Sequence, residues 1–545
     1  MNETSNGYCA LILHTHLPYV HHPDYEHFLE EEWLFEALAE TYLPLLARFI
    51  ELRDASIPFR ISMSLTPPLL FMWKTASLRS KFATYLKNRE SLARQVEKDP
   101  ERFFHSEESD ADSQIRKRCI EHYVERYRRL QALWKSIDGD LLSSFRQLQD
   151  DGNLEILASA ATHGFLPLFQ RKEAIAAQIR LGVELTEKCF GRRPRGFWLP
   201  ECAWHEKLGA PLRAAGIEWL VLDHHGIVGA DPRPKHDHYR PAEIAEGLFA
   251  FGRDPRCSEQ VWSSKVGYPG DPAYRELYRD IGYDADYRAI RPYLNPDGIR
   301  RNVGLKFQRI TADVELHEKK NYDPEAAEIR TRAHAANFLD SRRDQIADLR
   351  RTLDTRPVLT APYDTELFGH WWYEGPSFLE QLFRQHQLRG DAAGFEFATP
   401  SEILDHRGPR SRVFAHPSTW GRNGYSEVWA NEKNAWMWPH LFEMQKRMCQ
   451  RAEEFSQRNP TWMERRFLNQ MVRELLLAES SDWPFIVTME TSAHYAERRF
   501  RDHVHRFFAL EDAFDGALFS EAELHSVELH DAVFPDLDFR IYAGA

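Results

Sequence analysis

Short apolar runs alternate with helical stretches through the first three quarters of this chain, and that alternation limits the folds open to it. Six runs predict buried strands, at residues 8–13, 59–64, 154–157, 196–199, 218–222 and 358–361. Amphipathic segments at 173–190 and 324–353 predict helices between them. Such alternation is typical of an α/β fold with a parallel sheet. No glycine-rich phosphate-binding turn follows the first run, which favours a barrel over an open sheet.

Three segments depart from this rhythm. Residues 75–150 are highly charged with a helical period, so we expect a helical insertion between a first part of the barrel (1–74) and a second part (151–409). Residues 231–272 are rich in proline, glycine and aromatic residues and predict long loops. The remainder, 410–545, is expected to form a C-terminal all-helical domain, because helical patterns recur at 432–457, 463–478 and 490–508.

The composition excludes several classes of partner. A net charge of −13 argues against nucleic acid, and no apolar stretch reaches the length of a membrane span. Six scattered cysteines and the lack of a secretory signal predict a cytoplasmic protein, with a monomer as the expected state. Fifteen tryptophans and twenty tyrosines suit a sugar ligand, whose rings pack on aromatic faces, although a large core also uses such residues.

Two acids stand at the ends of apolar runs. Glu201 follows Trp198-Leu199-Pro200, and Asp364 ends the run that begins at residue 358. Because the carboxyl ends of barrel strands meet at one face, the two can form the carboxyl pair of a glycosidase. We expect Glu201 to be the nucleophile, held in a dry setting, and Asp364 the acid/base, its pKa raised by burial and by neighbouring negative charge. The alternative is that either acid caps a helix or pairs with an arginine.

Three histidines also follow predicted strands. His14 and His16 lie on one side of an extended segment, and His163 occupies the corresponding place after another strand. A His-x-His pair with a third ligand supplies the number of protein ligands typical of a catalytic zinc site, which would suit a metal-dependent carbohydrate deacetylase. A polar rim that binds sugar hydroxyls is the second interpretation, and a set of hydrogen-bonded loop histidines is the third.

Several tryptophans lie in segments that read as the floor or rim of a cleft. Trp371 belongs to a stretch dense in acids and aromatics, and Trp262 lies in a predicted loop. Trp420 and Trp429 flank a glycine-rich loop, which favours exposure of both. Asp482, in Ser480-Ser481-Asp482-Trp483, has the same acidic and aromatic surroundings within the helical region.

Five motifs, in this order, resemble those of glycoside hydrolase family 57. They are His-Thr-His-Leu-Pro-Tyr at 14–19, Gly-Asn-Leu-Glu-Ile at 152–156, Trp-Leu-Pro-Glu-Cys-Ala at 198–203, Tyr-Asp-Thr-Glu-Leu-Phe-Gly-His-Trp-Trp at 363–372 and Glu-Ser-Ser-Asp-Trp at 479–483. The resemblance covers essentially the whole chain. It implies an incomplete (β/α)7 barrel with a helical insertion and a C-terminal helical domain.

The resemblance also implies a mechanism and a substrate class. Glu201 matches the family's nucleophile and Asp364 its acid/base in a retaining reaction on α-glucan polysaccharide, with no metal and no other cofactor. His14, His16, His163 and Asp482 match positions around the cleaved bond, and Trp262, Trp420 and Trp429 look like glucan-contacting aromatics.

Among the family's activities, the chain length and the form of the third motif favour 1,4-α-glucan branching. An α-amylase and a 4-α-glucanotransferase stay open as alternatives, and a non-catalytic glucan-binding protein is disfavoured by the intact acid pair. The segment between Asp223 and Gln260 looks short for a branching enzyme, and Tyr239 within it is a candidate for controlling whether water enters.

Overall fold

Seven parallel strands form the centre of the protein. The computed structural model describes residues 5–104, 109–263, 266–406, 408–516 and 519–544. The parallel strands are β1 (Tyr8–Thr15), β2 (Ile61–Leu65), β3 (Leu154–Ser159), β4 (Gly196–Trp198), β5 (Trp219–Leu222), β7 (Leu248–Gly252) and β8 (Val358–Asp364). The sheet runs β6-β7-β5-β4-β3-β2-β1-β8, and one parallel bridge, Arg253 to Thr360, links the residue that follows β7 to β8. The predicted incomplete (β/α)7 barrel is therefore confirmed.

All six predicted strands are present, but one prediction for residues 231–272 is wrong. This segment, expected to consist of loops, contains β6 (Ala242–Ala245), the seventh barrel strand β7, and helix α10 (Pro255–Trp262). β6 and β7 form an antiparallel hairpin that turns at Gly247, which has a φ of 66°. Both strands are short and flanked by proline and glycine, so the composition of the segment predicted loops rather than strands. A further two-residue strand, β9 (Glu396–Phe397), pairs with the start of β1.

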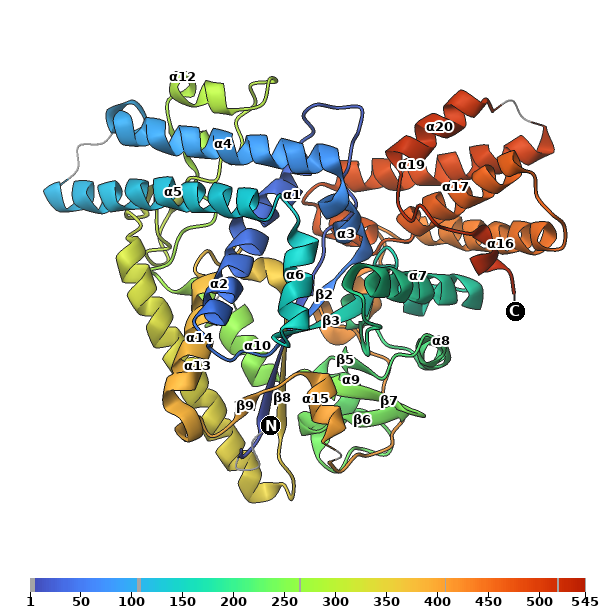
Figure 1. Cartoon of the computed structure of the whole chain (residues 1–545), viewed down its shortest axis with the longest axis horizontal. Coiled ribbons are helices and arrows are strands. Elements are labelled where there is room, and N and C mark those ends of the chain that lie inside the picture. The colour runs from blue at the N-terminus through green and yellow to red at the C-terminus, as the bar shows by residue number, and fades with distance from the viewer. Residues whose placement is uncertain (1–4, 105–108, 264–265, 407, 517–518, 545) are drawn as a thin grey trace.

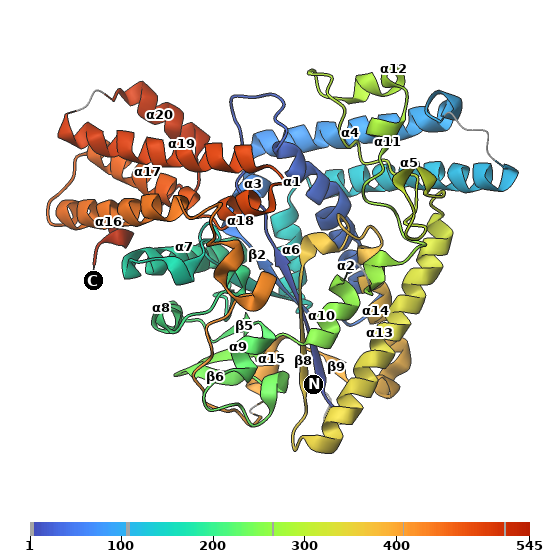
Figure 2. The same cartoon turned by 180° about the vertical axis from the view of Figure 1, so that it is seen from behind.

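Helices surround the barrel on its outer side. They are α1 (Glu31–Ala37), α2 (Leu43–Asp54), α7 (Lys172–Phe190), α8 (Gly209–Ala214), α9 (His224–Val228), α10, α13 (Pro324–Thr352), α14 (Gly375–Arg389) and α15 (Pro400–Asp405). Two short helices, α11 (Ile281–Asp284) and α12 (Tyr287–Ile290), lie away from the barrel strands (Figures 1 and 2). A π-helical turn, η1 (Leu38–Tyr42), joins α1 to α2. Figure 1 shows α13 and α14 side by side along one flank of the barrel, and Figure 2 shows the same pair from behind.

The predicted helical insertion lies between β2 and β3. It consists of α3 (Pro67–Lys74), α4 (Ala76–Lys98), α5 (Asp110–Ser136) and α6 (Leu141–Asp150), with α4 and α5 lying side by side as a long hairpin (Figures 1 and 2). Buried positions on α5 recur every three or four residues, at Cys119, Ile120, Tyr123, Tyr127, Leu130 and Trp134. This spacing gives α5 one apolar face, which packs on α4 while the charged face stays in solvent.

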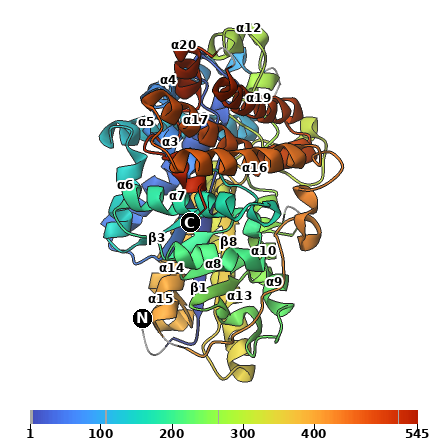
Figure 3. The same cartoon turned by 90° about the vertical axis from the view of Figure 1, so that its right-hand side faces the viewer.

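The C-terminal part is helical, as predicted. It contains α16 (Met437–Ser456), α17 (Trp462–Ala478), α18 (Asp482–Met489), α19 (Ala493–Asp512) and α20 (Glu521–His530). Figures 1 and 3 show these helices as a bundle beside one end of the barrel strands. No described helix combines the length and apolar character needed to cross a membrane. The domain boundaries stated above stay predictions.

Candidate active site

Glu201 occupies a tight turn directly after β4. The turn is the 3₁₀ segment Pro200–Cys202, in which Glu201 and Cys202 have φ values of 64° and 50°. A side chain in this left-handed region costs about 1–2 kcal/mol, so the surrounding structure must enforce it. Trp420 does so by donating its backbone N–H to the Glu201 carbonyl oxygen at 3.0 Å. Strain of this kind is typical of functional positions.

Two donors hold the carboxylate of Glu201. The indole Nε1–H of Trp420 donates to Oε2 at 2.9 Å, and the hydroxyl of Ser481 donates to Oε1 at 2.8 Å. The side chain is 13% exposed. Burial raises the pKa of Glu201, while the hydrogen bonds from Trp420 and Ser481 act to lower it. Burial is the larger effect, so the Glu201 pKa is raised overall, and the two donors orient the carboxylate and offset part of that rise.

Asp364 ends β8 beside His14, its register partner on β1. Burial raises the pKa of Asp364 well above its ordinary value, the charges of Glu366 and Glu201 raise it further, and Arg253 acts in the opposite direction. Among the described residues, no hydrogen bond to the Asp364 carboxyl group is found, so its proton is free for a substrate. The predicted direction of the pKa and its two causes are confirmed, and they suit a general acid.

His14, His16 and His163 form one stacked wall. The ring centroids of His16 and His163 are 3.9 Å apart, those of His14 and His163 are 4.9 Å apart, and His14 stacks on Trp198 at 4.6 Å. Each Nδ1 atom bonds a hydroxyl. That of His14 lies 2.6 Å from Ser64, that of His16 2.9 Å from Thr66, and that of His163 2.8 Å from Ser481. The predicted juxtaposition of the three histidines is confirmed.

The three rings differ in charge. Burial lowers the pKa of His14 and His163 well below the ordinary value, and the neighbouring His16 lowers both further. Burial also acts to lower the pKa of His16, but Asp482, whose Oδ2 lies 2.9 Å from Nε2, raises it overall. The ring most readily protonated is therefore His16, which lies against Asp482, while a proton on His14 or His163 is disfavoured.

A metal centre at these histidines is not what the donor geometry favours. Each Nδ1 atom is bonded to a hydroxyl and the Nε2 atom of His16 to Asp482, so among the described residues only the Nε2 atoms of His14 and His163 are open, fewer than the three protein ligands of a zinc site. Within the described ranges, the group of His, Cys, Asp and Glu side chains close enough to share an ion is Glu474, His503 and Asp531, in the C-terminal helices. Arg506 and Arg499 already accompany Asp531 there, at 2.6 and 3.7 Å. The wall suits hydrogen bonding to sugar hydroxyls better than zinc binding.

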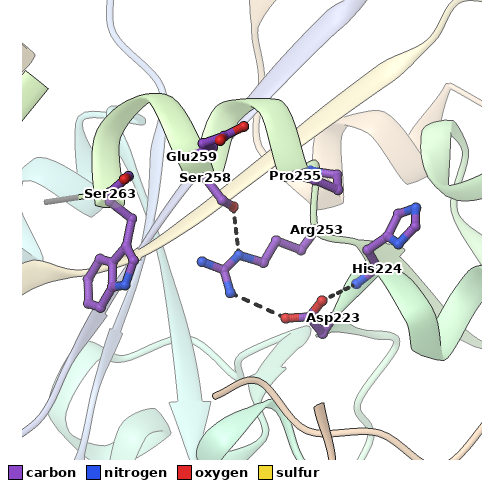
Figure 4. A pocket seen from close by; sticks show the side chains of 8 residues that line it. Asp223, His224, Arg253, Pro255, Ser258, Glu259 and Ser263 are labelled. Atoms are coloured by element: carbon purple, nitrogen blue, oxygen red, sulfur yellow. Dashed lines mark hydrogen bonds and ion pairs between the residues drawn. The ribbon is translucent and has the colours of Figure 1, made fainter. Parts of the chain in front are cut away.

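Trp262 lines a pocket of about 310 Å³. It is 45% exposed, and the pocket wall also includes Asp223, His224, Arg253 and Glu259 (Figure 4). Arg253 donates to Asp223 Oδ2 at 3.2 Å and to Ser258 Oγ at 2.6 Å, and its guanidinium lies 5.8 Å from the Trp420 ring centroid. Because Arg253 also acts on the pKa of Asp364, the pocket adjoins the catalytic acid.

The other tryptophans predicted to contact glucan differ in how exposed they are. Trp371, in the loop after β8, is 55% exposed, and Trp420 is partly buried against Trp198 and Glu201. The expected exposure of Trp429 is wrong: it is 1% exposed and stacks on Phe165 at 5.0 Å. The turn at Ser426–Val428 folds Trp429 inward, beneath the glycine-rich loop, so it supports the site from below.

Tyr239 lies in a short 3₁₀ segment, Asp237–Tyr239, and its ring packs on His238 at 4.0 Å. None of the described hydrogen bonds or ring contacts joins it to Glu201 or Asp364. Its role in water entry stays a prediction.

Several residues of the site were not identified from the sequence. Ser64 bonds His14, and Thr66 bonds His16. The two hydroxyl residues are two positions apart, like the two histidines, because β2 pairs with β1 in register. This spacing after a predicted strand was a usable signal. Glu366 and Ser481 lie inside two of the five motifs, but no local pattern showed which side chains they contact, since Ser481 and Glu201 are 280 residues apart. Arg253 lies in none of the motifs.

Comparisons with known proteins agree with this geometry. Residues 10–416 match Glycosyl hydrolase family 57, and residues 440–542 match the family described as 1,4-alpha-glucan branching enzyme, C-terminal. A 1,4-alpha-glucan branching enzyme of Thermococcus kodakarensis is 33% identical, over 92% of this chain and 73% of its own length. A solved α-amylase of Thermotoga maritima has a TM-score of 0.90 at 39% identity, covering 99% of both chains.

A second solved structure, a GH57-type branching enzyme of Pyrococcus horikoshii, has a TM-score of 0.86 at 32% identity and covers 99% of this chain and 97% of its own. The family match extends over more than half of the chain and includes β1, β4 and β8, which carry His14, Glu201 and Asp364. This chain belongs to glycosyl hydrolase family 57.

Proposed function

We propose that this protein is a retaining 1,4-α-glucan branching enzyme. The observation that carries the proposal is the contrast between the two acids at the mouth of the barrel. Trp420 and Ser481 donate to the Glu201 carboxylate and offset part of the rise that burial causes in its pKa, whereas burial and neighbouring charge raise the pKa of Asp364 well above its ordinary value. This is the division of roles that glycosyl transfer with retention requires. The named branching enzymes that resemble the chain support the choice of substrate and product.

The first step breaks an α-1,4 bond. Glu201 attacks the anomeric carbon while Asp364 gives its proton to the departing 4-oxygen, which leaves as a hydroxyl. In the second step the 6-hydroxyl of a glucan attacks the same carbon, and Asp364 takes the proton of that hydroxyl. The bond to Glu201 breaks, the carboxylate is restored, and an α-1,6 branch is formed. Two inversions at one carbon leave the α configuration unchanged.

Hydrolysis is the second candidate, because the Thermotoga maritima structure that this chain resembles at 39% identity is titled an α-amylase. Water would then replace the 6-hydroxyl in the second step, with the same two acids in the same roles. Transfer of the same glycosyl unit to a 4-hydroxyl would give a 4-α-glucanotransferase. Exclusion of water from the intermediate decides among these outcomes.

One incubation distinguishes the candidates. Amylose is treated with the protein, and α-1,6 anomeric proton signals are followed by NMR together with the number of reducing ends. Branching predicts growing α-1,6 signals with no matching rise in reducing ends. Reducing ends alone would make the protein an amylase. No change in either, with a changed distribution of chain lengths, would make it a 4-α-glucanotransferase, and no change in all three would contradict action on α-glucan. Glu201→Gln, which keeps the shape of the side chain, serves as the inactive control.

The proposal includes a cytoplasmic location, supported by six free and buried cysteines. The expectation of a monomer stays a prediction.

A further inference from the structure

Ser481 stands at the N-cap position of α18 but does not cap this helix. A serine at an N-cap ordinarily accepts a hydrogen bond from an N–H of its own first turn. The Ser481 side chain makes no such bond. Its Oγ instead lies 2.8 Å from Glu201 Oε1 and 2.8 Å from His163 Nδ1, and the residue is 1% exposed. The N-terminus of α18 therefore lacks a side-chain cap, and the Ser481 hydroxyl bonds active-site residues instead.

The direction of both hydrogen bonds follows from the donors available. A carboxylate can only accept, so the single hydroxyl proton of Ser481 points to Glu201. His163 Nδ1 must then carry a proton and donate it to Ser481 Oγ. In a neutral ring this leaves Nε2 as an acceptor. Burial, together with His16 and His14, keeps the His163 pKa well below its ordinary value, in agreement with a neutral ring.

His163 Nε2 is the atom that this tautomer leaves free. It is buried, and among the described residues it has no hydrogen-bond partner. A buried acceptor without a partner costs about 1–3 kcal/mol. A sugar hydroxyl can satisfy it by donating to Nε2, which is the direction that a proton on Nδ1 sets.

Two paired loops fix Ser481 in place. Its backbone N–H donates to the His163 carbonyl oxygen at 3.0 Å, and Ser480 forms an antiparallel bridge with Gly164. One loop follows β3 of the barrel and the other joins α17 to α18. The hydroxyl is therefore carried to the nucleophile by the C-terminal helices.

We propose that Ser481 is a positioning residue for the nucleophile: its hydroxyl holds the Glu201 carboxylate and fixes the tautomer of His163. The inference rests on the proposed function only in taking Glu201 as nucleophile, and it applies equally to transfer and hydrolysis. Without the hydroxyl, Glu201 loses one of two donors to its charged form, so a higher pH is needed to ionise it.

The test isolates the first chemical step. Maltosyl fluoride is a suitable probe, because fluoride leaves without help from an acid and its release reports attack by Glu201 whatever acceptor follows. The pH dependence of kcat/KM is measured for the wild type and for Ser481→Ala, Ser481→Gly and Ser481→Thr. Loss of the hydroxyl is expected to move the acidic limb upward by about one pH unit. Threonine, which retains a hydroxyl, is expected to return it toward the wild type.

A matched control lies on the same helix. The hydroxyl of Thr488 bonds the carbonyl oxygens of Val428 and Pro484, away from Glu201. Thr488→Val is expected to leave the acidic limb unchanged, which separates the effect from general loosening of α18. Glycine is well tolerated at an N-cap and provides a second deletion if the alanine variant does not fold.

An acidic limb that stays in place in both the alanine and glycine variants, with fluoride release by the wild type intact, would overturn the inference alone. An equal shift of the acidic limb in Thr488→Val and in the Ser481 variants would also overturn it. Absence of fluoride release from the wild type would instead contradict the proposed function.

Discussion

Glu201 combines a left-handed backbone with two fixed donors to its carboxylate. Glu201→Gln keeps the size of the side chain but removes the charge that attacks the anomeric carbon. We expect kcat on amylose to fall by about 10³-fold or more, as for other nucleophile deletions. Binding of maltoheptaose, followed by calorimetry, should stay within about threefold, because the aromatic and histidine contacts are intact. Turnover close to the wild type in this variant would remove Glu201 as the nucleophile.

Glu366 is a third acid in the site, two residues beyond the catalytic one. Its Oε1 accepts hydrogen bonds from Tyr42 at 2.5 Å and from the His16 backbone at 3.3 Å. Burial raises the pKa of Glu366 to about 7, and its charge in turn raises the pKa of Asp364. In Glu366→Gln the Asp364 pKa falls, so the general acid loses its proton at a lower pH.

The expected result is that the basic limb of kcat/KM on amylose moves to lower pH, by about half a unit or more. Glu97→Gln, at an exposed position on α4, is the control and should leave the limb in place. A basic limb that moves upward or stays fixed in Glu366→Gln would show that Glu366 does not act on Asp364.

The proposed catalytic pair could be chosen from the sequence because both acids end apolar runs of the barrel. Ser481 stands in the fifth motif, but its hydrogen bond to Glu201, 280 residues away, could not be predicted from a local pattern. Trp429 shows the opposite error: a glycine-rich loop beside a tryptophan suggested exposure, but packing on Phe165 buries it. Local patterns report which face of an element is apolar, and they do not report which distant segment covers it.

At the level of elements, α7 lies so close to β3 that one of its positions has room only for glycine. A Cβ at Gly182 would overlap the backbone oxygen of Ser159. We expect Gly182→Ala to lower the free energy of unfolding by about 2 kcal/mol or more, because a backbone group cannot move aside. Gly209→Ala in α8 is the matched helical control, since its Cβ would lie 3.4 Å from that of Ala245. Urea denaturation compares the two, and equal losses would contradict the close packing of α7 on β3.

Long helices and long apolar runs were predicted closely. The helix expected at 324–353 is α13 (Pro324–Thr352), and the one at 463–478 is α17 (Trp462–Ala478). Both start with recognisable caps: a proline after Asp323, and a Thr461–Glu464 capping box. β6 and β7 lack such markers, and only their pairing with β5 and with each other makes them strands.

For the whole molecule, the active site is shared between the barrel and the C-terminal helices. Ser481 and Asp482 enter it from the loop that starts at Glu479. Glu479 is itself buried between the two parts and accepts hydrogen bonds from Gln178 of α7 and Gln445 of α16, at 2.8 and 2.9 Å. Burial raises the pKa of Glu479 to about 8, so it is held as a neutral acid at the interface.

This predicts how stability depends on pH. Because the Glu479 pKa is higher in the folded state than in the unfolded state, its contribution is complete below the unfolded value. It is lost as the pH rises toward 8, by about 1.4 kcal/mol per pH unit. In Glu479→Gln that loss is absent, so urea unfolding free energies should fall less steeply between about pH 5 and pH 8. Slopes equal to the wild type would contradict a neutral Glu479.

The central claim is that Glu201 forms a covalent bond to the glucan, and it can be observed directly. 5-Fluoro-α-glucosyl fluoride forms such an intermediate but hydrolyses slowly, because fluorine destabilises the oxocarbenium-like transition state. After incubation and digestion, mass spectrometry should find one added fluoroglucosyl unit on the peptide containing Glu201, and none in Glu201→Gln. A label on another carboxyl group, or steady turnover of the probe by Glu201→Gln, would contradict the account.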